Sequence, residues 1–495
     1  MYPPQTSLIP TAVALTKFLE VHGFSAFNIN YPFWYLGSTP YKFLIGPLIP
    51  VLLSFIHRIL INSNLFSITI YLVLFSILIS ALGWGILVYK VQNEKSKFIF
   101  LIVLILLLIM PWRYLVAIGL DDASFTIARN FLPFVFISYW SFMKKRNILN
   151  TIVGILNTSI LLLINTNIIP ALIVGSVALG IAYSYQEGKI KGFFKSIKYL
   201  IPIIAASLLI ATFWYSPSYW LTILTNPSIG GSSTLKATLR IFDLFKGIVP
   251  LLLAITAVYF SGKIKSRLML FSLVWFFTFL FLTLFRLISN IDFWQDWTSW
   301  FWELEIGIVL MSSKLILGVT HQVFTLIGDV KYPKLLYNRF SEYLIVFGLI
   351  FTLFVAANTL YNKLGRPNLL NRQVPEEVLS SLDRLESISK DNIVFLSGST
   401  VFWADSLYDL RQVRGGRDEV SLDTDWDKAS WEIRQGSDPK RSYEWISKLN
   451  ISYILVHTED SSEYYHDFNN LKKWEKIGKK VWEKNGDEII SVSNE

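Results

Sequence analysis

The chain lacks cysteine and has few histidines and few charged residues. Its 495 residues include no cysteine and five histidines, and charged residues make up 16% of the sequence. Without cysteine there can be no disulfide, no thiolate metal ligand and no cysteine nucleophile. No two histidines have the spacing of a zinc-binding pair on a helix, which disfavours a histidine zinc site. Soluble domains usually carry about 25% charged residues, so the composition also disfavours an ordinary soluble enzyme.

Long apolar runs fill the chain between residues 65 and 361. Hydrophobic residues make up 53% of the sequence. A run of about 20 such residues is long enough to cross a hydrocarbon layer as a helix, and we expect about ten such spans. They are expected at 65–90, 97–117, 123–143, 148–165, 168–185, 198–215, 247–260, 267–287, 300–327 and 341–361. The sequence therefore predicts a mostly α polytopic membrane protein.

Lysine and arginine gather in every second linker between these runs, as at 144–146 and 189–195. Such linkers face the cytoplasm under the positive-inside rule. Residues 1–64 and 362–495 then both lie outside, and the chain is expected to be a multi-pass protein of the cell membrane. The net charge of +9 comes from the part before residue 362, so it indicates membrane topology and not nucleic-acid binding.

Two shorter apolar stretches, 5–21 and 41–61, precede the first long run. If the second crossed the membrane, the alternation of basic linkers would break at Lys90. We therefore expect both stretches to be juxtamembrane helices on the outer face, within an external loop formed by residues 1–64. A chain that begins outside without a signal peptide is hard to insert. We expect an upstream first span that is missing from this sequence.

Residues 362–495 read as a small extracytoplasmic α/β domain after the transmembrane part at 65–361. Their pattern predicts helices at 375–390 and 426–449, strands at 392–396 and 451–456, and a hairpin over 480–493 that turns at Asn485-Gly486. No hydrolase, zinc-protease or dinucleotide motif is present. Because this region has its own apolar strands, we expect it to fold independently.

Two adjacent acids, Asp121 and Asp122, stand in a short external turn between two predicted spans. Their carboxylates suit a divalent cation such as Mg²⁺ or Mn²⁺, and Asp121 is the candidate catalytic residue. Alternatively, Asp122 caps the helix that follows. Arg113 and Arg129 lie nearby, and a cation inside a span needs a partner. Each arginine is a candidate to bind a lipid phosphate, and Arg129 alternatively pairs with one of the two acids.

An aromatic and acidic stretch lies at the outer end of a later span, from Asp292 to Glu305. Indoles such as those of Trp297 and Trp300 suit either the ordinary aromatic belt of a membrane protein or the wall of a sugar-binding cavity. Glu303 and Glu305 fall inside the predicted helix, where buried acids need a function or a partner. We take these four residues as candidate substrate-binding residues.

Several motifs resemble those of one membrane-protein superfamily. Glu20-Val21-His22-Gly23, the run from Asn30 to Pro40, and Gly46-Pro47-Leu48 resemble the first external loop of the GT-C glycosyltransferases. The layout is more narrowly similar to the pyruvoyl-tetrahydropterin-synthase-related membrane proteins. Further support comes from residues 213–220 with Gly230-Gly231, and from residues 412–417.

The resemblance implies a polyprenyl-phosphate-linked sugar donor and a catalytic acid directly after the first transmembrane helix. No aspartate precedes Asp121, so this chain departs from the pattern there. Asp121 and Asp122 resemble the second acidic motif of the superfamily, in which a carboxylate binds a divalent cation or positions the acceptor.

Together these features predict a membrane-embedded transferase that moves a sugar from a polyprenyl phosphate to an acceptor outside the membrane. The transfer is expected to invert the configuration of the anomeric carbon. The alternative is a non-catalytic component that binds or exports glycans or lipid-linked saccharides. A secondary transporter ranks third, because the sequence has no obvious inverted repeat and its acids lie at the outer boundary of the spans.

Overall fold

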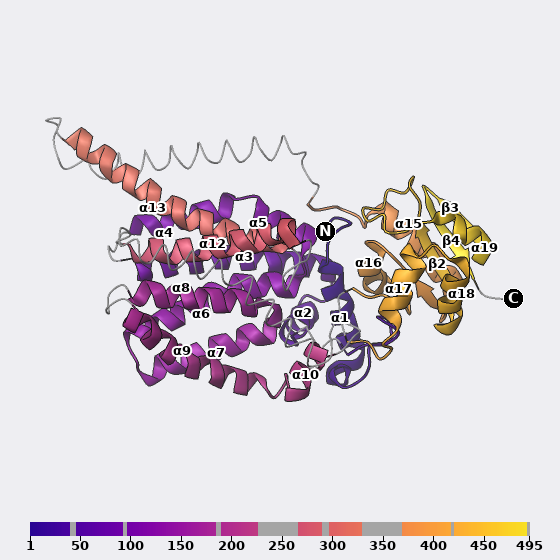
Figure 1. Cartoon of the computed structure of the whole chain (residues 1–495), viewed down its shortest axis with the longest axis horizontal. Coiled ribbons are helices and arrows are strands. Elements are labelled where there is room, and N and C mark those ends of the chain that lie inside the picture. Colours follow the sequence, from indigo (N-terminus) through magenta and orange to yellow (C-terminus); the bar gives the residue numbers. More distant parts are fainter. Residues whose placement is uncertain are drawn as a thin grey trace.

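A helical bundle and a smaller α/β unit make up the described part of the protein (Figure 1). The computed structural model describes residues 1–39, 46–92, 97–184, 190–225, 266–289, 297–328, 369–416 and 420–492. The α/β unit, residues 369–492, is called the tail domain below. The mostly helical fold with one small mixed sheet near the C-terminus confirms this part of the predicted fold class.

The bundle helices lie close to the predicted apolar runs. They are α3 (Leu65–Val91), α4 (Lys97–Ile109), α5 (Trp112–Leu115), α6 (Ala123–Lys144), α7 (Ile148–Ile164), α8 (Ile169–Ser184), α9 (Ile190–Ala211), α10 (Pro217–Thr225), α12 (Arg267–Ser289) and α13 (Phe301–Gly328). The expected span 97–117 is broken at Pro111, which cannot continue a helix because it lacks the backbone N–H. After α5 the chain makes one π-helical turn, Val116–Leu120.

Four of the described helices are long and apolar enough to cross a membrane. They lie within Leu65–Val91, Thr166–Ser184, Gly192–Ala211 and Arg267–Leu284. A fifth is added if Phe98–Ile109 and Trp112–Leu120, which meet at a bend of 48°, count as one span. The spans expected at 247–260 and 341–361 lie outside the described residues, so the count of ten stays a prediction.

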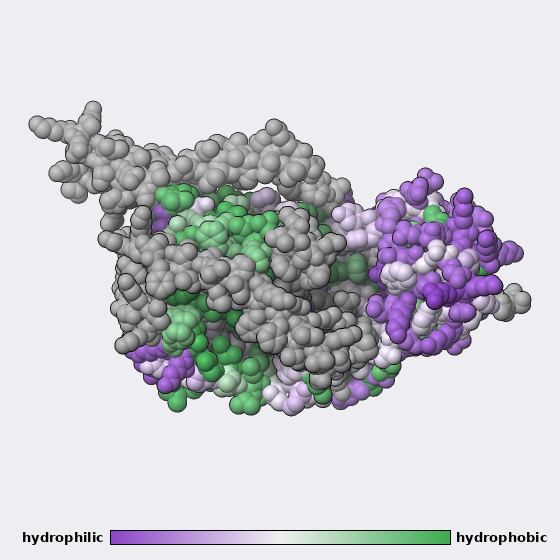
Figure 2. Space-filling view, in the orientation of Figure 1, coloured by the Kyte–Doolittle hydropathy of each residue, from purple (hydrophilic) through white to green (hydrophobic). Residues whose placement is uncertain are grey.

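Aromatic side chains fill the centre of the bundle. Trp84 of α3 packs edge-on against Trp275 of α12, with 5.3 Å between ring centres, and Phe136 of α6 packs on both rings. Apolar side chains such as Phe75 and Leu209 are exposed on the outside. On the face drawn in Figure 2, the coloured surface of the bundle is largely hydrophobic and that of the tail domain is hydrophilic, as expected for a membrane part and a solvated part.

The tail domain is built on a four-stranded sheet of order β1-β2-β4-β3, in which β1 and β2 are parallel and the other pairs antiparallel. Its strands are β1 (Ile393–Phe395), β2 (Ile451–His457), β3 (Lys479–Lys484) and β4 (Asp487–Ser491). Its helices are α15 (Glu376–Ser389), α16 (Thr400–Leu407), α17 (Trp426–Gln435), α18 (Pro439–Lys448) and α19 (Trp474–Ile477). The hairpin turns at Asn485-Gly486, where both residues have positive φ, as predicted. The helix expected at 426–449 is two helices, because Gly436 and Pro439 interrupt it.

The tail domain shares its core with the beginning of the chain. Helices α1 (Ile9–His22) and α2 (Leu48–Ile59) lie at the end of the bundle next to it (Figure 1). Residues 9–38, the first-loop segment, insert aromatic side chains: Trp34 is fully buried, and the Tyr35 ring lies 4.4 Å from that of Trp426. Part of the tail core therefore comes from this segment. The expectation that the tail folds independently stays a prediction.

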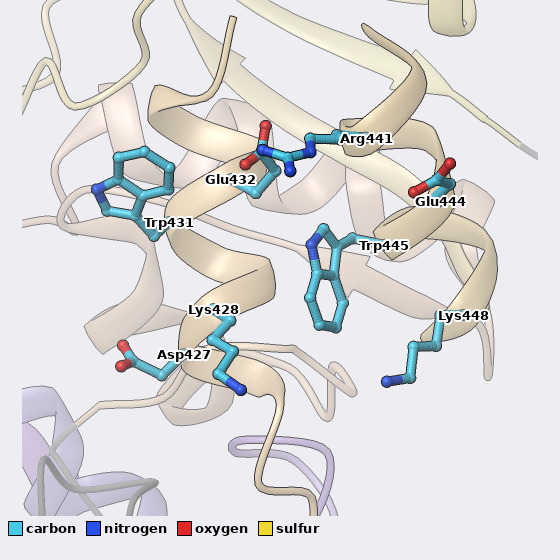
Figure 3. A pocket seen from close by; sticks show the side chains of 8 residues that line it. All are labelled: Asp427, Lys428, Trp431, Glu432, Arg441, Glu444, Trp445 and Lys448. Carbon is cyan, nitrogen blue, oxygen red and sulfur yellow. The ribbon is translucent and has the colours of Figure 1, made fainter. Parts of the chain in front are cut away.

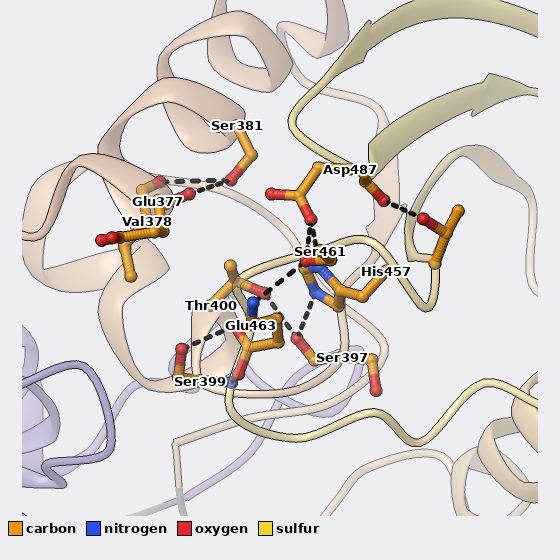
Figure 4. Close-up of polar contacts among 12 residues, drawn as sticks. Glu377, Val378, Ser381, Ser397, Ser399, Thr400, His457, Ser461, Glu463 and Asp487 are labelled. Atoms are coloured by element: carbon orange, nitrogen blue, oxygen red, sulfur yellow. Dashed lines mark hydrogen bonds and ion pairs between the residues drawn. The ribbon is translucent and has the colours of Figure 1, made fainter.

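A polar network ties the ends of β1 and β2 together (Figure 4). His457 Nδ1 lies 2.9 Å from Asp487 Oδ1, and its Nε2 lies 3.1 Å from the carbonyl oxygen of Ser397. The Glu463 carboxylate accepts from the backbone N–H and the hydroxyl of Ser399. Burial lowers the pKa of His457, but the hydrogen bond and charge of Asp487 outweigh it and raise that pKa. The network fixes the loop that leads into α16.

Candidate functional site

Asp121 and Asp122 lie between the π-helical turn and the first residue of α6. The Asp122 Oδ1 atom accepts the backbone N–H of Phe125 at 2.9 Å and the hydroxyl of Ser124. Asp122 is therefore the N-cap of α6, the alternative left open by the sequence. Its carboxylate satisfies a backbone N–H that has no partner within the helix.

Arg129 lies two turns inside α6 and is buried. Helical side chains lean toward the N-terminus of their helix, which directs its guanidinium back to Asp121. Arg129 Nη1 donates to Asp121 Oδ2 at 2.5 Å, and Arg129 Nε lies 3.0 Å from Glu303 Oε1. One guanidinium thus bridges two carboxylates that are far apart in the sequence. We call Asp121, Arg129 and Glu303 the charged cluster.

Two further contacts of the charged cluster were not predicted from the sequence. The centre of the Phe125 ring lies 3.9 Å from the Arg129 guanidinium. Phe125 stands one turn before Arg129 on α6, so helical spacing could have indicated this contact. The Ser299 hydroxyl donates to Asp121 Oδ2 at 3.4 Å. Ser299 is distant in the sequence and carries no spacing signal that points to Asp121.

Arg113 is a second buried cation at the same end of the bundle. Its guanidinium lies 4.9 Å from the centre of the Trp302 ring, and its Nη1 donates to the Leu107 carbonyl at 3.4 Å. Among the described residues, no hydrogen-bond partner of its Nε and Nη2 atoms is found. Glu305 is also buried, and its negative charge attracts the Arg113 guanidinium. Buried donors without acceptors cost about 1–3 kcal/mol each, so this guanidinium is suited to receive an oxyanion.

The tryptophans in and beside the predicted site differ in what their rings contact. Trp300, at the end of the short helix Trp297–Trp300, is fully buried, and its ring centre lies 5.4 Å from that of Phe279. Its ring is thus part of the bundle core. The side chain of Trp297 lies outside the described part of the chain. Trp302, which the sequence analysis did not select, is the indole in contact with both arginines.

Both aspartates already have partners within the protein, and the divalent cation expected at them stays a prediction. Asp121 Oδ2 is bonded to Arg129, and Asp122 Oδ1 caps α6. Among the described residues, no group of three or more histidine, aspartate or glutamate side chains is arranged to hold a metal. A cation directly beside a guanidinium would also be repelled by it.

No protein-family model and no curated protein matches the chain. Solved structures do match. The archaeal oligosaccharyltransferase AglB from Archaeoglobus fulgidus, in complex with an inhibitory peptide and a dolichol-phosphate, has a TM-score of 0.54 at 12% identity over 98% of this chain and 70% of that one. The same enzyme in complex with Zn and sulfate has a TM-score of 0.52 at 12% identity over 92% of this chain and 64% of that one.

The arabinofuranosyltransferase AftD from Mycobacteria has a TM-score of 0.51 at 14% identity. It is matched over 100% of this chain, which spans 38% of AftD. The chain thus has the fold of the GT-C glycosyltransferases, as the motifs of its first loop predicted. At these identities the likeness concerns the fold. The narrower resemblance to the pyruvoyl-tetrahydropterin-synthase-related proteins stays a prediction.

Proposed function

We propose that the chain is a membrane-embedded transferase that moves a sugar from a polyprenyl phosphate to an acceptor outside the membrane. The observation that carries the proposal is the buried Arg113, which lies beside the charged cluster and whose Nε and Nη2 have no acceptor in the part of the chain that the structure describes. A buried cation with unused donors is costly unless a ligand supplies the acceptor. A lipid-linked phosphate supplies oxygens that a guanidinium binds in pairs.

In the proposed reaction, the acceptor hydroxyl loses its proton to the Asp121 carboxylate and its oxygen attacks the anomeric carbon. The bond from that carbon to the phosphate oxygen breaks, and the electron pair leaves with the polyprenyl phosphate. Arg113 stabilises the charge on the departing phosphate, and Arg129 contributes from its place in the charged cluster. Glu303 keeps Arg129 in position, and Glu305 does the same for Arg113. Attack from the face opposite the phosphate inverts the anomeric carbon.

The proposal also includes the topology of the chain in the membrane. The bundle crosses the cell membrane about ten times, and the first-loop segment and tail domain face outside, where the acceptor arrives. Trp297 belongs to the segment expected to face the sugar, whereas the Trp300 ring supports that segment from the bundle core. The partners are membrane lipid and the lipid-linked sugar. A divalent cation at Asp121 and Asp122 stays a prediction, and no step of the proposed reaction depends on it.

A second function is favoured by one observation. Asp121 already holds Arg129 at 2.5 Å, and a carboxylate in an ion pair is a weak base because the cation stabilises its charged form. The chain would then bind a lipid-linked saccharide, or take part in its export, without transferring the sugar.

The test compares two neighbouring acids in the purified full-length chain in proteoliposomes. A labelled polyprenyl-phosphate-linked sugar is the donor, and an extract of the native cell envelope is the source of acceptor. Asp121→Asn should lose about 100-fold or more of the activity, the usual effect of removing a general base. Its melting temperature should change little, because Glu303 still compensates Arg129. Asp122→Asn is the matched control, since asparagine is also a good N-cap.

Full activity of Asp121→Asn with a lowered melting temperature would show that the ion pair with Arg129 is structural. The proposal of Asp121 as the base would then be wrong, and saccharide binding without transfer would be the better account.

A further inference from the structure

The tail domain contains a hollow of about 710 Å³ between α17 and α18, away from the charged cluster. Ligand sites in proteins usually have volumes of about 300–1,000 Å³, so its size is in the range of a small-molecule site. Two tryptophans line it, Trp431 from α17 and Trp445 from α18, and charged side chains surround them (Figure 3). The proposed transfer reaction uses none of these residues.

Trp431 is the unusual member of this set. Its side chain is 54% exposed, whereas Trp403, Trp426 and Trp474 in the same domain are buried. In the described part of the protein, the Trp431 ring makes no stacking or cation–π contact. A large aromatic ring that folding leaves in water loses the stabilisation that burial gives the other indoles. The exposed part of this ring remains available to a ligand.

Trp445, in contrast, is held in place. It packs against the core of the tail domain, and the Lys448 ammonium lies 4.8 Å from the centre of its ring. Lys448 is itself fixed by Asp425, whose carboxylate it contacts at 2.5 Å. The hollow therefore has one anchored aromatic wall and one open aromatic face.

The charged side chains around the hollow narrow the class of ligand. Three acids and three bases line it, so it has no net charge. Asp427, Arg441 and Glu444 take part in no ion pair within the described residues. They offer both donors and acceptors to a ligand. A phosphorylated or nucleic-acid ligand would need an excess of positive charge. A lipid surface is also a poor ligand, because inserting Trp431 into it would bring the surrounding charged side chains close to the hydrocarbon, which is unfavourable in free energy.

A neutral ligand with an apolar face and many hydroxyls fits these features. We propose that the hollow between α17 and α18 binds a neutral oligosaccharide. A sugar ring stacks its C–H face, which is weakly positive, on the electron-rich face of Trp431. Its hydroxyls hydrogen-bond to Arg441 and Glu444. This binding does not depend on whether the chain transfers sugar.

The test measures binding to the full-length chain in detergent micelles. The probes are neutral oligosaccharides of glucose, mannose, galactose, N-acetylglucosamine and arabinose, with an oligogalacturonate as the acidic comparison. Binding is followed by isothermal titration calorimetry. We expect saturable binding of at least one neutral oligosaccharide in the millimolar range or tighter, and weaker binding of the acidic one.

Trp431→Ala should weaken that binding about tenfold or more, and Trp431→Phe, which keeps an aromatic face, should weaken it less. Tyr464→Ala is the matched control, because Tyr464 is also an exposed aromatic residue of the tail domain but lies outside the hollow. A melting curve for each variant separates loss of binding from loss of fold. No saturable binding of any neutral oligosaccharide would overturn the proposal. So would equal binding by wild type and a folded Trp431→Ala, or a preference for the acidic oligosaccharide.

Discussion

Arg113 shows at the level of one residue why the bundle end is suited to binding. Its guanidinium is fully buried and lies over the Trp302 ring, and two of its nitrogens have no acceptor within the described ranges. A residue placed there only for stability would be expected to have its donors satisfied, because protein interiors leave few polar groups unpaired. The unsatisfied donors are consistent with a site that is completed by a phosphate.

Replacing this arginine by lysine separates charge from geometry. Arg113→Lys keeps the positive charge beside Glu305 but loses the planar pair of donors. We expect affinity for polyprenyl phosphate to fall about tenfold with little change in melting temperature. Native mass spectrometry of the chain with added polyprenyl phosphate measures this. Arg58→Lys, at an exposed position of α2, is the control and should bind like wild type. Equal binding by both variants would remove Arg113 from the phosphate site.

His457 leads to a pH-dependent prediction for the tail domain. Burial lowers its pKa, but the hydrogen bond and charge of Asp487 and the charge of Glu463 raise it overall above the ordinary value of about 6.5. A raised folded-state pKa stabilises the fold below the unfolded pKa, and this stabilisation is lost as pH rises through the folded value. The loss of stability in His457→Gln should therefore be largest near pH 6 and shrink at alkaline pH. Melting curves of wild type and His457→Gln at several pH values test this. A difference in melting temperature that grows as the pH rises would contradict it.

The first-loop segment and the tail domain depend on each other at the level of elements. Trp34 is fully buried against Thr11, Tyr31 and Gly416. The Cβ atom of any other residue at 416 would come within 2.7 Å of the Trp34 ring, so this contact requires glycine. The first-loop segment thereby fixes the tail domain on the bundle.

Trp34→Ala should destabilise this junction strongly. Truncation of a buried aromatic residue costs about 3–5 kcal/mol, and we expect a loss of that size in urea unfolding of the full-length chain, followed by near-ultraviolet circular dichroism. Val21→Ala, at an exposed position of the same segment, should be almost neutral. If Trp34→Ala unfolds at the same urea concentration as Val21→Ala, the shared core contributes no stability.

Helix and strand positions could largely be predicted, because they depend on local periodicity. The runs at 65–90 and 148–165 became Leu65–Val91 and Ile148–Ile164, and the hairpin turned at the expected residues. The breaks at Pro111 and Gly436 were missed, although both residues disfavour helix. Pairing of Arg129 with Asp121 was one of the alternatives read from the sequence. The contact of Arg129 with Glu303 was not among those alternatives. This contact joins α6 to α13, and the sequence does not indicate which faces of distant helices meet.

The arrangement of the whole molecule predicts which segments share a side of the membrane. Tyr2 and Asn371 form a backbone bridge, and α1 packs on α16, so the beginning of the chain and the tail domain lie at one end of the bundle. The positions of the basic linkers predict that this end faces outside. Single cysteines at 25 and 459, both exposed, should react with an impermeant maleimide in intact cells, whereas one at 145 should not. Labelling at 25 without labelling at 459 would contradict the fold, and labelling at 145 alone would reverse the topology.

The most direct test of the whole account is to measure sugar transfer and release of lipid phosphate in the same reaction. The purified chain in proteoliposomes is given a doubly labelled polyprenyl-phosphate-linked sugar and an extract of the native cell envelope. The account predicts that free polyprenyl phosphate appears in equal amount to transferred sugar, and that Asp121→Asn loses both signals together. A wild-type chain that binds the lipid-linked sugar but releases no polyprenyl phosphate would contradict the transferase and leave a binding protein with the same fold.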